Sequence, residues 1–458
     1  MKRLVILDVV GLTPDMLTHA PNLRALAEDG FAAPLDPVFP AVTCSVQSTF
    51  VTGRAPRDHG VVANGWYFRD LGEVWLWRQS NQLVQGDKVW HEAKARDASF
   101  TSSTLFWWYA MGGDFEQAVT PRPAYFADGR KAPDIWTDPA ALKGELNGAL
   151  GPFPLFDFWG PKAGLPSSEW IADAACHVLR NRPTTMTFVY LPHLDYDLQR
   201  LGPDHPKIPA EVRAIDAVAG RVIDTAREQG CEVVVLSEYG ITEVRDGVRI
   251  NRVLRQEGFL RAQENQVGEL LDVTVSRAFA VADHQSAHVY VRDPADVPAV
   301  KTCLERIDGV ERVLDEAGKR ELGIDHARSG ELVAISARDR WFSYDYWLDD
   351  AEAPDFARTV DIHKKPGYDP LELILDPDIR FPMLKIGAYL LKKKLGLRGL
   401  MEVIPFDTTL IKGSHGRLPE ADGEGPVLIC SDASRSAERV KAADVRQLLL
   451  DLVFEGAS

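Results

Sequence analysis

The chain has 458 residues, and its 67 acidic against 52 basic side chains give a formal net charge of −15. This balance leaves no basic footprint and argues against tight binding to nucleic acid polymers. Five dispersed cysteines without C-x-x-C spacing are typical of reduced thiols. The first residues lack the apolar core of a signal peptide, and no run approaches a membrane span. These features predict a cytoplasmic protein without a transmembrane segment.

Residues 3–10 form a continuous apolar run that is interrupted by one carboxylate, Asp8. A helical pattern follows from Pro14, and this succession is typical of a buried central strand that leads into a helix. A lone aspartate near the C-terminal end of a strand in an open parallel sheet lies where ligands bind. Asp8 is therefore a metal-ligand candidate, with a turn or capping aspartate as the alternative.

Residues 39–66 read FPAVTCSVQSTFVTGRAPRDHGVVANGW and contain a hydroxyl nucleophile at a helix start. The Phe39-Pro40 pair ends an extended segment, and the periodic run 44–51 predicts a helix whose first turn carries Thr43. Helix N-termini attract anions, so a phosphate attacked by the Thr43 hydroxyl would meet backbone N–H donors. The alternative is that Thr43 only caps the helix.

This stretch resembles the nucleophile segment of the nucleotide pyrophosphatase/phosphodiesterase branch of the alkaline phosphatase superfamily, which runs F-P-x-x-T, T-G-x-x-P and H-G-x-x-x-N. The resemblance implies that Thr43 is both the nucleophile and a metal ligand. It also implies that Asn64 contacts the transferred phosphoryl group and that Asp8 binds metal. Two divalent metal ions are expected, with zinc favoured and manganese or magnesium as alternatives.

The segment from 66 to 165 is rich in tryptophan, phenylalanine, proline and glycine. Such aromatic density favours a packed core, although rings around a site also stack on a base or an aryl group. The resembled family places leaving-group contacts in this region. Trp66 and Tyr67 are therefore candidates for such contacts.

The next buried strand, TMTFVYLP, is followed by HLDYDLQRLGPDH. The resembled family has D-x-x-G-H-x-x-G-P here, and an alignment on its G-P places Asp195 on a ligand aspartate and Gln199 on a histidine. A glutamine oxygen favours an oxygen-loving ion and weakens zinc binding. His193 and Asp197 are the alternatives for the missing ligand.

A helical pattern, PAEVRAIDAVAGRVIDTAREQG, leads into the strand CEVVVLSEYGI. The resembled family has S-D-H-G at this point, where this chain has Glu238 and Tyr239. Glutamate keeps the negative charge, whereas a phenol with a pKa near ~10 coordinates only when a strongly acidic metal ionises it. These replacements make a degenerate, non-catalytic family member, which binds a phosphorylated metabolite or a partner, the second hypothesis.

Residues 250–400 show a strand, helix, strand, strand pattern that predicts an inserted α+β cap. Asp283-His284 is one polar cluster of this segment, and Asp361 with His363 is another that would complete the metal sites if Gln199 and Tyr239 do not. The run RFPMLKIGAYLLKKKLGLRGL is a basic amphipathic helix pattern. We expect its apolar face to pack inward, and peripheral contact with an anionic membrane is the alternative.

The C-terminal part, LIKGSHGRLPEADGEGPVLIC, resembles the family pattern G-x-H-G followed by a closing strand, and a terminal helix is expected from Ala437. The predicted fold is a doubly wound, mostly parallel α/β core of the alkaline phosphatase type, with residues 1–249 and 401–458 forming the core and 250–400 the cap. The resemblance implies metal ligation by Asp8, Thr43, Asp195, Glu238 and His415.

The predicted function is a metal-dependent phosphoric ester hydrolase that forms a phosphothreonine intermediate on Thr43. Phosphodiesters and pyrophosphates are the expected substrates, and phosphomonoesters and phosphonates are the alternatives. The expected partner is a small phosphorylated substrate. The sequence does not define the oligomeric state.

Overall fold

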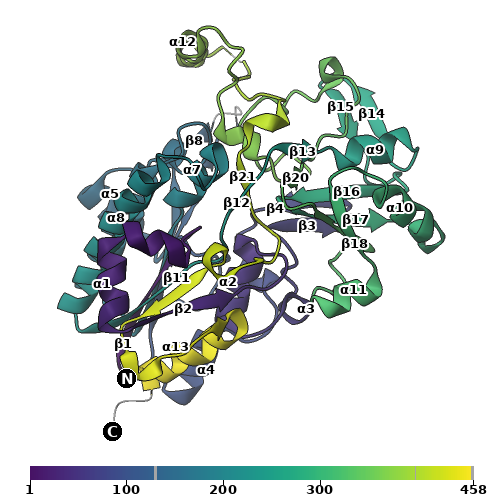
Figure 1. Cartoon of the computed structure of the whole chain (residues 1–458). Helices are drawn as coiled ribbons and strands as arrows, with labels where there is room; N and C mark the ends of the chain where they lie inside the picture. The colour runs from purple at the N-terminus through teal and green to yellow at the C-terminus, as the bar shows by residue number, and fades with distance from the viewer. Residues whose placement is uncertain (128–130, 398, 455–458) are drawn as a thin grey trace.

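The structure is a computed structural model that describes residues 1–127, 131–397 and 399–454. A nine-stranded sheet forms the centre of the molecule (Figure 1). In spatial order its strands are β23 (Val440–Lys441), β2 (Phe31–Asp36), β22 (Val427–Cys430), β11 (Cys231–Leu236), β1 (Arg3–Val9), β10 (Met186–Leu191), β5 (Ser102–Leu105), β6 (Gln117–Pro121) and β9 (Ile135–Asp138). The five strands from β11 to β6 are parallel, which confirms the predicted mostly parallel sheet.

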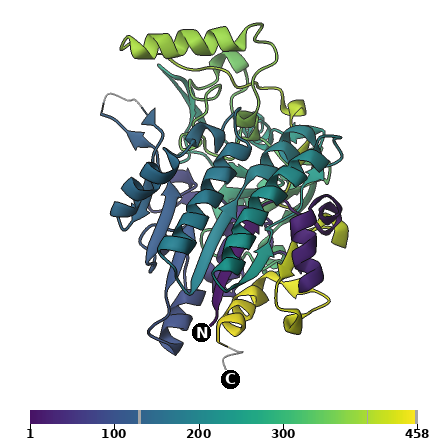
Figure 2. The same cartoon turned by 90° about the vertical axis from the view of Figure 1, so that its left-hand side faces the viewer.

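Helices cover both faces of this sheet, and β1 explains why. Val5, Leu7 and Val9 pack into one hydrophobic cluster, whereas Leu4 and Ile6 pack into another on the opposite face. A strand buried on both faces needs the continuous apolar run that the sequence shows. The first face carries α1 (Pro21–Asp29), α5 (Ala141–Leu150), α6 (Leu165–Asn181), α7 (His193–Leu201) and α8 (Ile208–Glu228), and Figure 2 looks onto this layer. The second face carries α2 (Thr43–Thr52), α4 (Val89–Arg96) and α13 (Val445–Phe454).

A second unit lies beside the core and consists mainly of the middle of the chain. Its antiparallel sheet has the order β16 (Ala278–Asp283), β17 (Ser286–Val291), β19 (Leu332–Ser336) and β18 (Val310–Leu314). It is accompanied by α9 (Ile250–Gln256), α10 (Val297–Leu304) and α11 (Glu316–Glu321). Every described strand of the nine-stranded sheet lies before residue 237 or after residue 426. The exact boundaries of the inserted cap, 250 and 400, stay a prediction.

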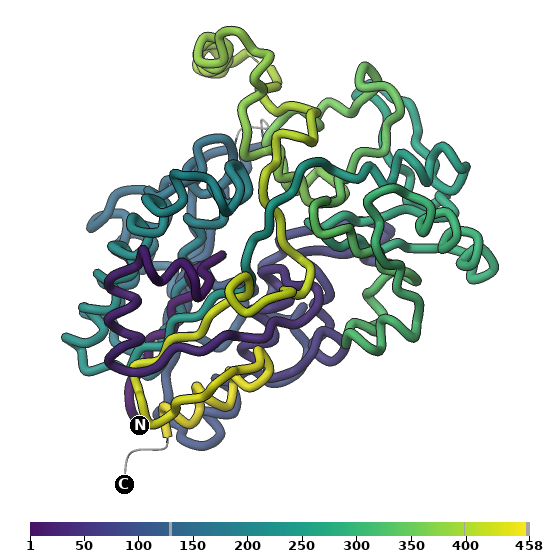
Figure 3. Tube along the Cα trace, in the orientation of Figure 1, coloured from purple at the N-terminus to yellow at the C-terminus, as the bar shows by residue number. Residues whose placement is uncertain are grey.

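The chain enters and leaves the second unit side by side (Figure 3). The outgoing strand β12 (Thr242–Glu243) pairs antiparallel with the returning strand β21 (Gly413–Ser414). Smaller elements complete the unit and its surroundings: α3 (Pro56–His59), β3 (Gly65–Phe68), β4 (Glu73–Leu76), β7 (Ala124–Tyr125), β8 (Lys131–Ala132), β13 (Asp246–Val248), β14 (Ala262–Asn265), β15 (Gly268–Leu271), β20 (Arg340–Phe342) and α12 (Pro382–Lys394).

The sequence predicted the starts of two helices, α13 and α2. The terminal helix begins at Val445 and not at Ala437, because Val440–Lys441 instead extend the central sheet by pairing with β2. The helix after Phe39-Pro40 begins at Thr43, as predicted, and ends at Gly53, whose φ of 65° is a left-handed conformation that glycine adopts without strain.

Candidate active site

The candidate site lies at the carboxyl ends of the central parallel strands. Asp8 on β1 is in register with Tyr190 on β10 and with Leu236 on β11. Asp195 follows β10 at the start of α7, and Glu238 follows β11. The three carboxylates are distant in the sequence and meet here because parallel strands end at one edge of the sheet.

Thr43 is the first residue of α2, and its side chain is buried. Its hydroxyl donates a hydrogen bond to Glu238 Oε2 at 2.8 Å and lies 3.2 Å from the Tyr239 hydroxyl. The N-cap residue Val42 provides no side-chain acceptor for the first turn of the helix. Thr43 is therefore held by the carboxylate cluster, and it does not serve as the N-cap of α2.

Asn64 is fixed beside this helix start. Its Oδ1 accepts a hydrogen bond from the Cys44 backbone N–H at 2.9 Å. Its backbone N–H and its Nδ2 donate to the two oxygens of Asp283 at 2.7 and 3.0 Å. Asp283 ends β16 of the inserted unit, so that unit positions the asparagine that the sequence assigns to phosphoryl binding.

Gln47 joins two of the carboxylates. It lies four residues after Thr43 on α2, so both side chains project from the same face of the helix. Its Nε2 donates to Asp8 Oδ2 at 2.9 Å and to Glu238 Oε1 at 2.7 Å, while its Oε1 accepts from the Trp108 backbone N–H at 2.9 Å. A neutral amide thus lies between two acidic side chains.

The third carboxylate, Asp195, is also held by neutral donors. Gln199 Nε2 donates to its Oδ2 at 2.7 Å, and the Tyr239 hydroxyl donates to its Oδ1 at 3.2 Å. His415 Nε2 lies 3.9 Å from Asp195 Oδ1. Gln199 Oε1 accepts from the Tyr368 hydroxyl at 3.0 Å, so the inserted unit contacts this half of the site as well.

A stack of rings closes the site. The His415 ring lies 3.5 Å from the Tyr239 ring and 3.7 Å from the His284 ring, which in turn stacks on Tyr368 at 3.7 Å. His415 Nδ1 is 2.8 Å from the Ala41 carbonyl oxygen and donates to it, which leaves Nε2 with its lone pair. The Tyr239 phenol ring is therefore packed face to face against the His415 imidazole.

Burial dominates the electrostatics of the three acids, and none of them forms an ion pair with a lysine or arginine of the described residues. Burial raises the pKa of Asp8 and of Asp195 to about 7. Burial and the nearby Asp8 carboxylate raise the pKa of Glu238 well above its ordinary range. Burial lowers the pKa of His415. At neutral pH these carboxylates favour any cation that can reach them.

Two buried atoms of the site lack hydrogen-bond partners among the described residues, Asp8 Oδ1 and His415 Nε2. Within the same part of the chain, no group of three or more His, Cys, Asp and Glu side chains is arranged to hold a metal ion. The amide of Gln47 and the hydroxyl of Tyr239 contact the carboxylates instead.

The alternative ligands that the sequence suggested have other partners. His193 Nε2 pairs with Glu211 at 3.0 Å, and Asp197 pairs with Arg200 at 2.9 Å. Asp361 forms an ion pair with Lys131 at 3.0 Å. Three further candidates also have contacts of their own: Tyr67 packs edge-on against Phe279, Trp66 stacks on Phe68, and His363 approaches the backbone of Leu76.

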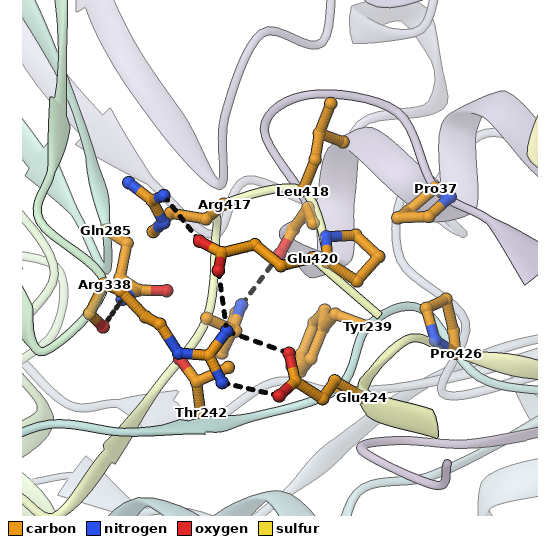
Figure 4. A pocket seen from close by; sticks show the side chains of 14 residues that line it. Pro37, Tyr239, Thr242, Gln285, Arg338, Arg417, Leu418, Glu420, Glu424 and Pro426 are labelled. Carbon is orange, nitrogen blue, oxygen red and sulfur yellow. Dashed lines mark hydrogen bonds and ion pairs between the residues drawn. The ribbon is translucent and has the colours of Figure 1, made fainter. Parts of the chain in front are cut away.

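A pocket borders the site where the core meets the inserted unit (Figure 4). Tyr239 and His415 belong both to the site and to the pocket lining. Arg338 lies in the lining and pairs with Glu424 at 2.6 Å and with Glu420 at 3.3 Å. Arg417 pairs with Glu420 at 3.1 Å. The pocket therefore places two guanidinium groups next to a cluster of acids.

A sequence profile of the type I phosphodiesterase/nucleotide pyrophosphatase family matches residues 4–369. The chain belongs to this family, which confirms the predicted membership. An uncharacterised pyrophosphatase/phosphodiesterase of Schizosaccharomyces pombe is 23% identical over 255 residues, which are 53% of this chain and 45% of that protein. The match thus spans less than half the length of the yeast relative.

Solved structures confirm the alkaline phosphatase type of fold. Murine ectonucleotide pyrophosphatase/phosphodiesterase 5, as an inactive threonine-to-alanine variant in complex with AMP, has a TM-score of 0.59 at 12% identity and covers 99% of this chain and 95% of that chain. Phosphonoacetate hydrolase from Sinorhizobium meliloti 1021 in complex with phosphonoacetate has a TM-score of 0.61 at 15% identity, with 99% and 96% covered.

Proposed function

We propose that the protein hydrolyses phosphodiester or pyrophosphate bonds of a small substrate through a phosphothreonine on Thr43. The observation that carries the proposal is the Thr43 hydroxyl, which starts a helix and donates to Glu238 at 2.8 Å between two groups of acids. In the first step Thr43 Oγ1 gives its proton to the Glu238 carboxylate and forms a bond to phosphorus, while the ester oxygen leaves with its electron pair and takes up a proton from solvent. Water then cleaves the phosphothreonine and restores the hydroxyl.

The chain's own residues orient these steps. Glu238 fixes the Thr43 hydroxyl, and the start of α2 offers backbone N–H groups to phosphoryl oxygens. Asn64 is rigidly held by Asp283 and Cys44, which suits it to bind a phosphoryl oxygen through the remaining hydrogen of its amide. Binding at these donors would place the phosphorus next to the hydroxyl.

The donor chemistry fits divalent cations. Three buried carboxylates receive hydrogen bonds from neutral groups, and both Asp8 Oδ1 and His415 Nε2 have no partner among the described residues. We assign Asp8, Thr43 and Glu238 to one cation and Asp195 with His415 to the other. A bound divalent cation would supply positive charge to the phosphoryl transition state and would acidify the nucleophile.

The donors are mostly oxygen, with His415 as the one imidazole of the assigned set. Oxygen donors favour Mg²⁺ and Mn²⁺, and each added imidazole shifts the preference toward Zn²⁺. We therefore propose manganese or magnesium as the working ions and zinc, which the family resemblance implies, as the competitor.

A specific observation favours a second candidate, a member that binds a phosphorylated ligand without turnover. Gln47, Gln199 and Tyr239 donate hydrogen bonds to all three carboxylates without metal, which is the arrangement expected if cations have been replaced. The two candidates differ in metal content and in chemistry at Thr43.

The test combines metal analysis with hydrolysis of a nitrophenyl phosphodiester in the presence of Zn²⁺, Mn²⁺, Mg²⁺ or Ca²⁺. Thr43→Ala should abolish turnover, and wild-type protein quenched in acid during turnover should carry one phosphoryl group on Thr43 by peptide mass. Ser48→Ala on the same helix is the matched control, because the Ser48 hydroxyl has no hydrogen-bond partner among the described residues. Ligand binding without turnover under every metal would favour the second candidate.

A further inference from the structure

Helix α12 stands apart from the rest of the molecule. Figures 1 and 2 show it at the end of the molecule opposite to both termini, connected to the body by the segments before and after it. None of its 13 residues is buried. Since an amphipathic helix of a globular protein normally buries its apolar stripe, this exposure needs an explanation.

The helix turns its apolar side away from the protein. Pro382, Ile386, Tyr389 and Lys393 are half-buried and recur at intervals of three and four residues, so this face is directed at the body. At about 100° per residue Leu384 and Leu391 lie on the opposite side, and Met383 and Leu390 lie on the adjoining flank. Their exposed fractions are 71% for Met383, 71% for Leu384, 55% for Leu390 and 59% for Leu391. The expectation that the apolar face packs inward is wrong for this helix.

The exposed apolar surface continues beyond the helix itself. Phe381 before α12 is 57% exposed, and Leu395, Leu397 and Leu400 after it are 67%, 58% and 50% exposed. Contiguous apolar exposure of this kind marks an interaction surface, whereas single exposed apolar residues do not.

The charge of the same segment identifies the kind of surface that it fits. Residues 380–400 contain six basic and no acidic residues, although the whole chain has a net charge of −15. Lys385 and Lys392 flank the apolar face, and Lys394 lies within it, where its long side chain can extend its charged end to the side. Apolar residues bordered by lysines, in a segment without acids, match the interface of an anionic lipid bilayer.

We propose that residues 380–400, which include α12 and are here called the basic arm, dock this protein on an anionic membrane surface. The helix would lie in the plane of the headgroups with Leu384 and Leu391 in the acyl region and the lysines on lipid phosphates. A spanning role does not fit, because 13 residues extend about 20 Å and the hydrocarbon core is about 30 Å thick. Among the described residues, none of the helices has the length and apolar character to cross a membrane.

The charge also argues against the alternative occupants. A second copy docked through the same face would bring Lys385, Lys392 and Lys394 against the same three lysines, and like charges in contact are destabilising. The proposal is independent of the chemistry proposed for Thr43. Docking at this end would leave the N-terminus at the far end of the molecule, so an N-terminal tag does not interfere with the test.

Flotation of the full chain with vesicles tests the proposal. Wild-type protein should bind vesicles that contain phosphatidylglycerol, should bind phosphatidylcholine vesicles at least tenfold more weakly, and should lose affinity as salt is raised. The double variant Leu384→Glu/Leu391→Glu should bind these vesicles at least tenfold more weakly than wild type. Lys385→Glu/Lys392→Glu should show a similar loss, since each lysine near an anionic surface contributes substantially to the free energy of binding. Leu71→Glu is the matched control, because Leu71 is 55% exposed in a turn between β3 and β4, and it should bind like wild type.

Three results would overturn the proposal. The first is an absence of binding to the anionic vesicles. The second is equal binding by Leu384→Glu/Leu391→Glu, with a thermal melt that shows this variant to be folded. The third combines two observations. Analytical ultracentrifugation would show wild type as an oligomer and Leu384→Glu/Leu391→Glu as a monomer, and wild type would not bind lipid at concentrations where it is an oligomer. The basic arm would then be an interface between copies.

Discussion

The substitution Asp195→Asn should make the metal-free protein more stable at neutral and alkaline pH. Burial raises the pKa of Asp195 from an ordinary value of 3.8 to about 7. Without metal the folded chain keeps a proton on Asp195 at pH values where the unfolded chain has released it. Folding therefore loses stability as the pH rises from about 4 to about 7. Asparagine is neutral throughout this range and removes that loss.

The magnitude follows from the two pKa values. They differ by about 3, and each unit corresponds to about 1.4 kcal/mol. The contribution of Asp195 to the free energy of unfolding of wild type should therefore fall by about 4 kcal/mol between about pH 4 and about pH 8. The asparagine oxygen can still accept from Gln199, and the Tyr239 hydroxyl can accept from the new amide. We expect the hydrogen-bond rearrangement to cost about 1 kcal/mol at any pH.

Urea unfolding with a chelator present measures this effect at several pH values. The informative quantity is the stability of Asp195→Asn minus that of wild type, because it cancels the titration of all other groups. Asp197→Asn is the control on the same helix, since that carboxylate pairs with Arg200, and its difference from wild type should not rise with pH. A flat difference for Asp195→Asn would refute the picture of an uncompensated buried carboxylate. Added Mn²⁺ at pH 8 should stabilise wild type more than the variant.

Replacing Gln47 with glutamate adds a carboxylate next to Asp8 and Glu238, so it should lower the metal-free melting temperature at neutral pH and tighten Mn²⁺ binding in calorimetry. Thr43→Ser should keep measurable hydrolysis in the nitrophenyl assay because it retains the hydroxyl. The folded triple variant Gln199→His/Glu238→Asp/Tyr239→His should bind zinc more tightly than wild type in competition with a chelator. No gain would mean that positions 199 and 239 do not face the cations.

Much of the core could be predicted because its elements have strong local signals. Residues 3–10 and 185–192 are apolar runs long enough for strands that are buried on both faces, and the structure has β1 and β10 there. Thr43 could be located at a helix start because Phe39-Pro40 ends the preceding extended segment. Asp8 could be placed by the general rule that functional side chains follow parallel strands at one edge of a sheet, whereas Asp195 and Glu238 were implied by the resemblance to the family pattern.

The supporting residues of the site had no such signal. Gln47 lies inside a helix whose ten residues are all buried, and a single glutamine there gives no sign of whether it faces the core or a pair of acids. Asp283 lies 219 residues after Asn64, and its carboxylate reaches the site only because the inserted sheet packs against the core. In the sequence, Asp283 next to His284 indicated a polar cluster but did not indicate that Asp283 would bind Asn64.

The basic arm shows a different limit of sequence reasoning. The periodicity of residues 382–394 defines which residues share a face of the helix, but it does not define which face meets the protein. Ile386 and Tyr389 lie on the half-buried side of the helix, and the leucines are exposed to solvent. Only the three-dimensional arrangement distinguishes a buried stripe from a docking surface.

Tyr239 connects the metal question to the packing of the site. A histidine at this position would offer a nitrogen to a cation, whereas the tyrosine hydroxyl spans from Thr43 to Asp195 and its ring stacks on His415. Burial raises the pKa of this phenol well above its ordinary value, so the hydroxyl stays protonated and acts as a hydrogen-bond donor near neutral pH. A protonated phenol between the nucleophile and an acid stabilises a metal-poor site, and a divalent cation must compete with that hydrogen bond. The affinity for a divalent cation should therefore rise more in the single variant Tyr239→His than in the single variant Gln199→His.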